Sequence, residues 1–115
     1  MIAEDSTSVR QMMEFTLSSA GFEVASAPDG KAAFEKLKAF RPNLIITDLH
    51  MPEMDGIELV RAVRSSPESK FIPILIVTNE TSVERKKEGR AAGATGWIVK
   101  PFNPKQLVAV IKRVL

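Results

Sequence analysis

The sequence contains no cysteine, no long apolar run and almost no excess charge of either sign. Without cysteine the chain forms neither disulfide bonds nor thiolate metal sites, which fits a cytoplasmic protein. No apolar run approaches the roughly 18 residues that span a bilayer, and no basic segment followed by an apolar stretch opens the chain. We therefore expect a cytoplasmic protein with no membrane insertion.

The charge balance argues against nucleic acid as a direct partner. The chain has 16 Lys and Arg against 14 Asp and Glu, a net charge of +2, which is too weak a bias to indicate direct contact with nucleic acid. Its 115 residues, 44% hydrophobic, are enough for one core and not for two. The composition thus predicts a single domain over residues 1–115.

Strand-like and helix-like segments alternate five times along the chain, with short connections. The expected strands cover residues 1–3, 22–27, 44–47, 72–77 and 97–99. The expected helices begin near residues 8, 29, 55, 82 and 103. Such alternation predicts an α/β fold in which a parallel sheet carries helices on both faces.

Local signals predict where several helices begin and end. Ser8 and Gln11 are placed as a capping box for the first helix, and Gly21 ends it. The fourth helix, over residues 82–92, is expected to pack shallowly, because its few apolar residues are mostly alanine and it holds a glycine in its interior.

The last helix has the stronger signals. Asn103 caps it, Pro104 takes its first position and Gln106 completes a second capping box. An apolar stripe follows at helical spacing, so this helix is expected to dock firmly.

Four of the expected strands end in a charged or hydroxyl group. The first leads into Glu4 and Asp5, the third into Asp48, the fourth into Thr78 and the fifth into Lys100. In open α/β sheets, ligands and chemistry lie at the carboxyl ends of the strands. These residues are therefore predicted to form one site.

The charges of this site predict a cation. Glu4, Asp5 and Asp48 would raise one another's pKa values unless positive charge lay among them. Lys100 supplies one positive charge, and a hard divalent cation would supply two. Oxygen ligands with retained waters suit Mg²⁺, which binds one or two carboxylates together with phosphate oxygens.

Four motifs resemble those of the CheY-like receiver domains of bacterial response regulators. They are the pair Glu4-Asp5, the string from Asp48 to Gly56, Thr78, and the triplet Lys100-Pro101-Phe102. They run from Ile2 to the C-terminus in the family's order and spacing. The resemblance implies a doubly wound, flavodoxin-like five-stranded sheet of order 2-1-3-4-5, the order of CheY itself.

The resemblance also implies the roles of the acidic residues. Asp48 would accept a phosphoryl group from a partner histidine kinase or phosphotransfer protein. The side chains of Asp5 and Asp48 and the backbone carbonyl of His50 would hold Mg²⁺, with Glu4 acting mainly through water.

The remaining roles follow from the same resemblance. Lys100 would stabilise charge on the transferring phosphoryl oxygens, and Thr78 would turn toward the phosphoryl group. Trp97 would rotate into the space that Thr78 vacates. His50 and Glu80 would flank the path of the hydrolytic water and set the dephosphorylation rate.

Two positions depart from the family pattern. Glu4 stands where the family often has a second aspartate, which could alter the water structure around the metal. Asn79 follows the threonine where a small residue is usual, which could narrow the access of a phosphodonor to Asp48. The resemblance also implies that the bond between Lys100 and Pro101 is cis.

Several interpretations remain open. The chain could be a stand-alone switch, of chemotaxis type for example, or a receiver cut from a longer regulator with an output domain. A downstream protein is expected on the face of the fourth helix, fifth strand and fifth helix, and the chain is expected to be a monomer or a phosphorylation-dependent dimer.

The alternative to a switch is an enzyme, a Mg²⁺-dependent phosphohydrolase with Asp48 as nucleophile and His50 as general acid and base. Thr78, Lys100 and Trp97 favour the switch.

Overall fold

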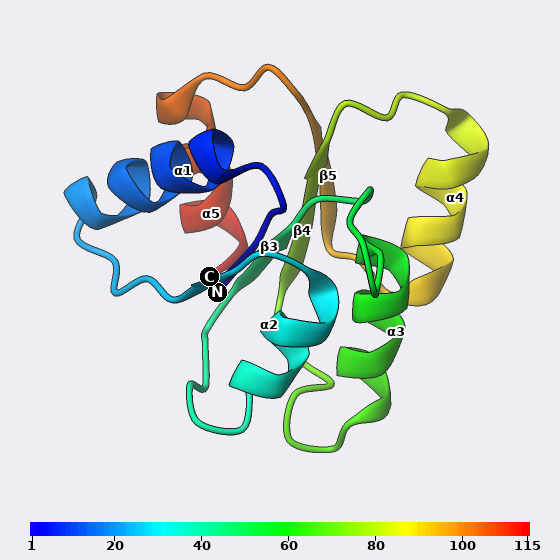
Figure 1. Ribbon diagram of the computed structural model, residues 1–115. Coiled ribbons are helices and arrows are strands. Elements are labelled where there is room, and N and C mark those ends of the chain that lie inside the picture. Colours follow the sequence, from blue (N-terminus) through cyan, green and yellow to red (C-terminus); the bar gives the residue numbers. More distant parts are fainter.

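The computed structural model describes all 115 residues and places five parallel strands between two layers of helices (Figure 1). The strands are β1 (Ile2–Ala3), β2 (Ser26–Ala27), β3 (Ile45–Thr47), β4 (Ile74–Thr78) and β5 (Gly96–Val99). The helices are α1 (Thr7–Ser19), α2 (Gly30–Lys36), α3 (Gly56–Ser65), α4 (Val83–Ala92) and α5 (Pro104–Val114). The strand order β2-β1-β3-β4-β5 confirms the predicted doubly wound fold.

The sheet is apolar on both faces, so the protein has two cores. Helices α1 and α5 cover one face, and α2, α3 and α4 cover the other (Figure 1). Alternate residues of each strand face opposite sides, so Ile46 packs with the α1 and α5 residues Met13 and Ile111, whereas Ile45 packs with the α3 residue Val60. Burial on both faces explains why the central strands are continuous apolar runs. None of the helices is long and apolar enough to cross a membrane.

Helix α1 begins earlier than predicted, and the capping box of Ser8 and Gln11 is wrong. The backbone is still extended at Ser6 (φ −73°, ψ 117°), and its Oγ accepts the N–H of Val9 at 3.4 Å. Ser8 therefore already lies within the first turn. The end was predicted correctly, since Gly21 has φ 94° and donates its N–H to a carbonyl of the last turn.

Helix α5 has the predicted cap but not the predicted box. Asn103 Oδ1 accepts the N–H of Lys105 at 2.8 Å, and Gln106 forms no reciprocal bond. Leu107 and Ile111 are buried, which confirms the firm docking of this helix.

Strand β2 is much shorter than the predicted residues 22–27. Only Ser26–Ala27 pair with a neighbour, because β1, the strand beside it, begins at Ile2. Strand length in a sheet depends on the partner as well as on the residues of the strand itself. The residues before Ser26, among them Phe22 and Val24, line an open groove of about 650 Å³.

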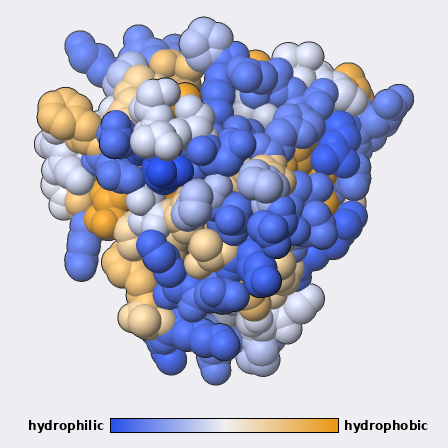
Figure 2. All heavy atoms as spheres, in the orientation of Figure 1, coloured by the Kyte–Doolittle hydropathy of each residue, from blue (hydrophilic) through white to orange (hydrophobic).

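Helix α4 packs as shallowly as predicted, and its side of the molecule is largely hydrophilic in Figure 2. Gly89 is its one buried residue, and a Cβ there would lie 3.0 Å from the indole of Trp97. The helix is tied at its C-terminal end, where Arg64 Nε donates to the Gly93 carbonyl at 3.0 Å. Arg64 Nη1 donates to the carbonyl of Ile72 at 2.6 Å, so one guanidinium joins α3, the segment before β4 and the end of α4.

Candidate functional site

The predicted site residues lie together at the carboxyl edge of the sheet. Glu4 and Asp5 follow β1, Asp48 follows β3, Thr78 ends β4 and Lys100 follows β5. Carboxylate oxygens of Glu4, Asp5 and Asp48 lie within 4.8 Å of one another. Glu4 is buried, Asp48 is largely buried and Asp5 is exposed, so the cluster opens to solvent on the side of Asp5.

Lys100 joins two of these carboxylates. Its Nζ lies 2.6 Å from Glu4 Oε1 and 2.9 Å from Asp48 Oδ2. The backbone also fixes the lysine, because its N–H donates to the Thr78 carbonyl at 2.8 Å. The bond between Lys100 and Pro101 is cis, as the resemblance implied. Lys100 therefore binds the ends of β1 and β3 to β4.

The pKa values of Glu4 and Lys100 are both raised, for different reasons. Burial raises the pKa of Glu4, and the hydrogen bond from Lys100 offsets only part of this effect. Burial alone would lower the pKa of Lys100, but its bonds to Glu4 and Asp48 outweigh that effect and raise it. Lys100 is therefore charged throughout the physiological range, and with all three carboxylates ionised the cluster has an excess of negative charge.

The loop after β3 fixes the position of Asp48. Leu49 donates its N–H to Asp48 Oδ1 at 2.6 Å. Gly56, the first residue of α3, donates its N–H to the Leu49 carbonyl at 2.9 Å. A Cβ at Gly56 would lie 2.3 Å from the backbone oxygen of Asp48, so only glycine lets α3 begin this close to the site.

Glu80 connects several of the predicted residues in the loops after β3 and β4. Its N–H donates to Thr78 Oγ1 at 3.3 Å, and its carbonyl accepts the indole N–H of Trp97 at 3.2 Å. Its carboxylate lies 3.1 Å from His50 Nε2 and accepts the N–H of Ser82, the cap of α4. Hydrogen bonds from Ser82 and then from His50 lower the pKa of the Glu80 carboxyl.

The sequence analysis missed two contacts that support Glu4. Arg10 Nη1 donates to the Glu4 carbonyl at 2.7 Å, and the N–H of Ser6 donates to Glu4 Oε2 at 3.1 Å. Arg10 lies one turn into α1 and points back to the strand end. The only sequence signal for this contact was the place of a basic residue in the first turn of the helix that follows Glu4 and Asp5.

The fold and the site together define a doubly wound α/β protein with an acidic cluster and one lysine at the carboxyl edge of its sheet. The family described as "Response regulator receiver domain" matches residues 1–112. The chain belongs to this family. It is therefore a receiver domain of two-component signalling rather than a conventional enzyme.

Relatives of known name agree with this assignment. The crystallised chemotaxis protein CheY4 of Vibrio cholerae is 52% identical, with a TM-score of 0.95 over 99% of this chain and 95% of that one. Chemotaxis protein CheY1 of Helicobacter pylori (strain ATCC 700392 / 26695) is 39% identical over 100% of this chain and 94% of its own length.

Other relatives are longer or carry a metal. The chain spans less than half of the curated relatives described as probable transcriptional regulator ycf27, 44% of the one from Galdieria sulphuraria, at 38% identity. The chain is also similar to the receiver domain of the Pseudomonas aeruginosa sensor histidine kinase PA1611. The two are 25% identical with a TM-score of 0.89, and the match covers 97% of this chain and 92% of that one. Its structure has a magnesium ion in the active-site cleft.

Proposed function

We propose that Asp48 accepts a phosphoryl group from the phosphohistidine of a histidine kinase or phosphotransfer protein, and that this modification switches the domain. The observation that carries the proposal is the contact of Asp48 Oδ2 with Lys100 Nζ at 2.9 Å beside two further carboxylates. A carboxylate oxygen of Asp48 forms the new P–O bond as the P–N bond of the donor breaks. The imidazole leaves with the electron pair of that bond.

The acidic cluster fits Mg²⁺. The side chains of Asp5 and Asp48 and the carbonyl of His50 would hold the ion, and all three offer the oxygen atoms that it prefers. When bound, Mg²⁺ neutralises charge on the transferring phosphoryl oxygens. Glu4 has a second role here that the sequence did not indicate, because it holds the ammonium of Lys100 at 2.6 Å.

Lys100 orients the phosphoryl group in this proposal. Its ammonium already contacts the carboxylate that is modified, and Glu4 keeps it in place when Asp48 changes. A phosphoryl oxygen on Asp48 can therefore take over the contact that a carboxylate oxygen makes in the unmodified protein. Charge-assisted hydrogen bonds of this kind are stronger than neutral ones.

The proposed function is tested by incubating the protein with acetyl phosphate and Mg²⁺ and measuring its intact mass. We expect one phosphoryl group per chain, and no adduct when EDTA removes the metal. A parallel assay with p-nitrophenyl phosphate separates the switch from the phosphohydrolase, because a receiver domain should show no sustained turnover. Continuous release of nitrophenol, or phosphorylation that is indifferent to EDTA, would contradict the proposal.

We also propose that Thr78 and Trp97 transmit the modification. Thr78 Oγ1 accepts the N–H of Glu80 in the unmodified protein, and its O–H can donate to a phosphoryl oxygen on Asp48, which would draw the hydroxyl and the loop bonded to it toward the phosphoryl group. The indole of Trp97 is bonded to the carbonyl of the same glutamate, so a displaced loop must carry the ring with it or release it.

Trp97 emission should therefore report activation. Titration with beryllofluoride and Mg²⁺ is expected to change the fluorescence of this single tryptophan in the wild type and not in Thr78→Ala. Thr81→Ala, which removes an exposed hydroxyl from the same loop, is the control and should behave as wild type. An unchanged signal in the wild type, or an equal change in Thr78→Ala, would show that Trp97 only packs.

The pair formed by His50 and Glu80 is proposed to set the lifetime of the phosphorylated form. The two side chains meet at 3.1 Å and join the loops after β3 and β4 next to Asp48. Replacing either by alanine should speed dephosphorylation severalfold, because water then reaches the phosphorus more freely. Phosphate release after removal of the donor measures the rate, with Glu84→Gln as a control on the exposed first turn of α4. Equal rates in the wild type, the two alanine variants and the Glu84→Gln control would contradict this role.

The output surface is proposed to be the face of α4, β5 and α5. A groove of about 310 Å³ is lined by residues of β5, α5 and the loop between them, among them Ile98, Phe102 and Val110, and it supports the binding of an unknown downstream protein at the β5 and α5 part of this face. The cytoplasmic location and a monomer or phosphorylation-dependent dimer remain part of the proposal. The relatives include proteins of chemotaxis type and longer regulators, and both kinds of pathway are compatible with this face.

A further inference from the structure

The middle of α4 rests on the sheet at Gly89, the one buried residue of this helix. Ile76 of β4 and Trp97 of β5 are paired in the sheet register, so their side chains lie next to each other on the face that α4 covers. A Cβ at Gly89 would lie 3.0 Å from Trp97 Cζ3 and 3.2 Å from Ile76 Cδ1. The backbone of the helix therefore lies directly against these two side chains.

The indole of Trp97 is held on its other side by the loop after β4. Its Nε1 donates to the carbonyl of Glu80 at 3.2 Å, while Cζ3 and Cε3 of its outer ring face Gly89. One rigid aromatic ring thus connects a backbone carbonyl of the loop to the backbone of the helix.

Glu80 has a second contact with α4, of a different kind. Its carboxylate accepts the N–H of Ser82 at 3.2 Å, at the first turn of the helix. The side chain of a glutamate has several rotatable bonds, so this contact can persist while the loop backbone moves. The indole is rigid and is attached through two rotatable bonds only, so it follows the carbonyl to which it is bonded.

Only glycine at position 89 lets the indole lie this close to the helix. Carbon atoms in contact are normally about 3.5 Å or more apart, so the Cβ of any other residue would occupy the place of Cζ3. The ring has no room to yield, because its Nε1 is fixed to Glu80 and Ile76 lies beside it. Glycine in a helix interior is unfavourable relative to alanine, and this contact is a structural reason for it here.

We propose that Gly89 is a positioning residue that seats the indole of Trp97 in α4, so that the ring and the helix move together when the loop after β4 is displaced. The inference rests on the proposed switch at Asp48 and assigns its step between the loop and the helix. The ring keeps its side-chain rotamer in this step, whereas a rotation into the space that Thr78 vacates would break its contacts with both Glu80 and Gly89.

The seat is tested by urea unfolding of Gly89→Ala in the wild type and in Trp97→Phe. Phenylalanine lacks the outer ring of the indole, and with it the Cζ3 atom that the new Cβ would meet. We expect Gly89→Ala to lower the unfolding midpoint when Trp97 is present and to raise it in Trp97→Phe, where only the helix preference of alanine remains. A Gly89→Ala chain that folds only together with Trp97→Phe would support the seat equally.

Ala91→Gly, on the exposed side of the same helix, is the control and should lower the midpoint by the same amount in both backgrounds. An equal effect of Gly89→Ala in the two backgrounds would overturn the seat. This experiment needs no phosphoryl group. Its failure is therefore distinguishable from failure of the proposed function, which the intact-mass assay decides.

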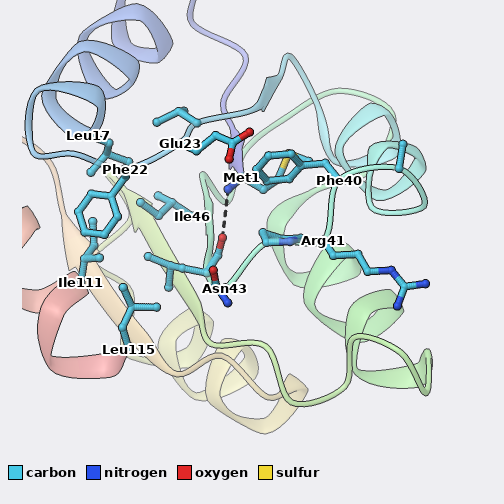
Figure 3. Close-up of a pocket in the computed structure, with 14 residues that line it drawn as sticks. Met1, Leu17, Phe22, Glu23, Phe40, Arg41, Asn43, Ile46, Ile111 and Leu115 are labelled. Carbon is cyan, nitrogen blue, oxygen red and sulfur yellow. Dashed lines mark hydrogen bonds between the residues drawn. The ribbon is translucent and has the colours of Figure 1, made fainter.

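The joint movement is tested by NMR with and without beryllofluoride and Mg²⁺. We expect the nuclear Overhauser effect between the Hα protons of Gly89 and Hζ3 of Trp97 to be kept in both states, while the amide signals of α4 shift. Phe22 is the internal reference, because it packs in the core on the opposite face of the sheet and lines the groove shown in Figure 3. Loss of the Overhauser effect on activation, or a shift at Phe22 as large as those in α4, would overturn the proposal.

Discussion

Asp48→Asn is expected to abolish the uptake of a phosphoryl group from acetyl phosphate. The amide that replaces the carboxylate has no charged oxygen to attack phosphorus, and no other carboxylate takes its place beside Lys100 while remaining open to a donor. Glu4 is buried, and Asp5 makes no contact with the lysine. Intact-mass analysis after incubation with the donor and Mg²⁺ measures the loss.

The fold should survive this substitution, because asparagine has the same shape and removes one of three clustered negative charges. Far-ultraviolet circular dichroism establishes this directly. Glu53→Gln is the matched control, since it removes an exposed carboxylate from the same loop outside the cluster. An adduct of undiminished yield in Asp48→Asn would show that another residue is the acceptor.

Gly56→Ala is expected to cause the largest loss of stability among conservative substitutions near the site. The new Cβ would lie 2.3 Å from the Asp48 backbone oxygen and 3.0 Å from the Leu49 Cα. Both are backbone atoms, so relief requires a shift of the loop or of α3 itself. Overpacking of this kind costs about 3 kcal/mol, a large share of the roughly 5–15 kcal/mol that stabilises a domain. Urea unfolding measures the difference.

The same shift should slow phosphorylation, because the displaced backbone belongs to the acceptor residue. Gly21→Ala is the control for the loss of a glycine. Its φ of 94° is strained for alanine, but no atom lies within 4 Å of the new Cβ, so its cost is about 1 kcal/mol. If both variants unfold at the same urea concentration, close packing at Gly56 is not what requires glycine there.

The sequence predicts the parallel sheet between two helix layers and the place of five candidate site residues at its carboxyl edge well, because both depend on local signals, whereas the strand order was implied by the resemblance to receiver domains. The end of an apolar run predicts the end of a buried strand, so a run that ends in Asp48, Thr78 or Lys100 also predicts where that side chain lies. A parallel sheet then brings the strand ends together. The choice between Ser6 and Ser8 as the cap of α1 is different. Both are serines near the helix start, and the hydrogen bond from Ser6 to the Glu4 carboxylate, a feature of the folded chain, favours Ser6.

Two further features lie beyond local signals. The length of β2 depends on where its neighbour begins, so its own apolar pattern overestimates it. The central place of Glu80 depends in part on its backbone carbonyl, which accepts from Trp97, and a sequence does not indicate where a loop carbonyl points. The side chain of Glu80 was identified, whereas its backbone contact and its bond to α4 were not.

The bond between Arg64 and the Gly93 carbonyl constrains how α4 can move. Its C-terminal end is anchored to α3 and to the segment before β4. Its N-terminal end is held by the carboxylate of Glu80 at the N–H of Ser82 and by the longer contact of Arg85 with Asp55 at 3.9 Å. A ten-residue helix is about 15 Å long. A tilt of about 10° about the anchored end would move the other end by about 2.6 Å and the anchored end hardly at all. A tilt of this kind would have its pivot at Gly93, and the first turn of α4 would be displaced most.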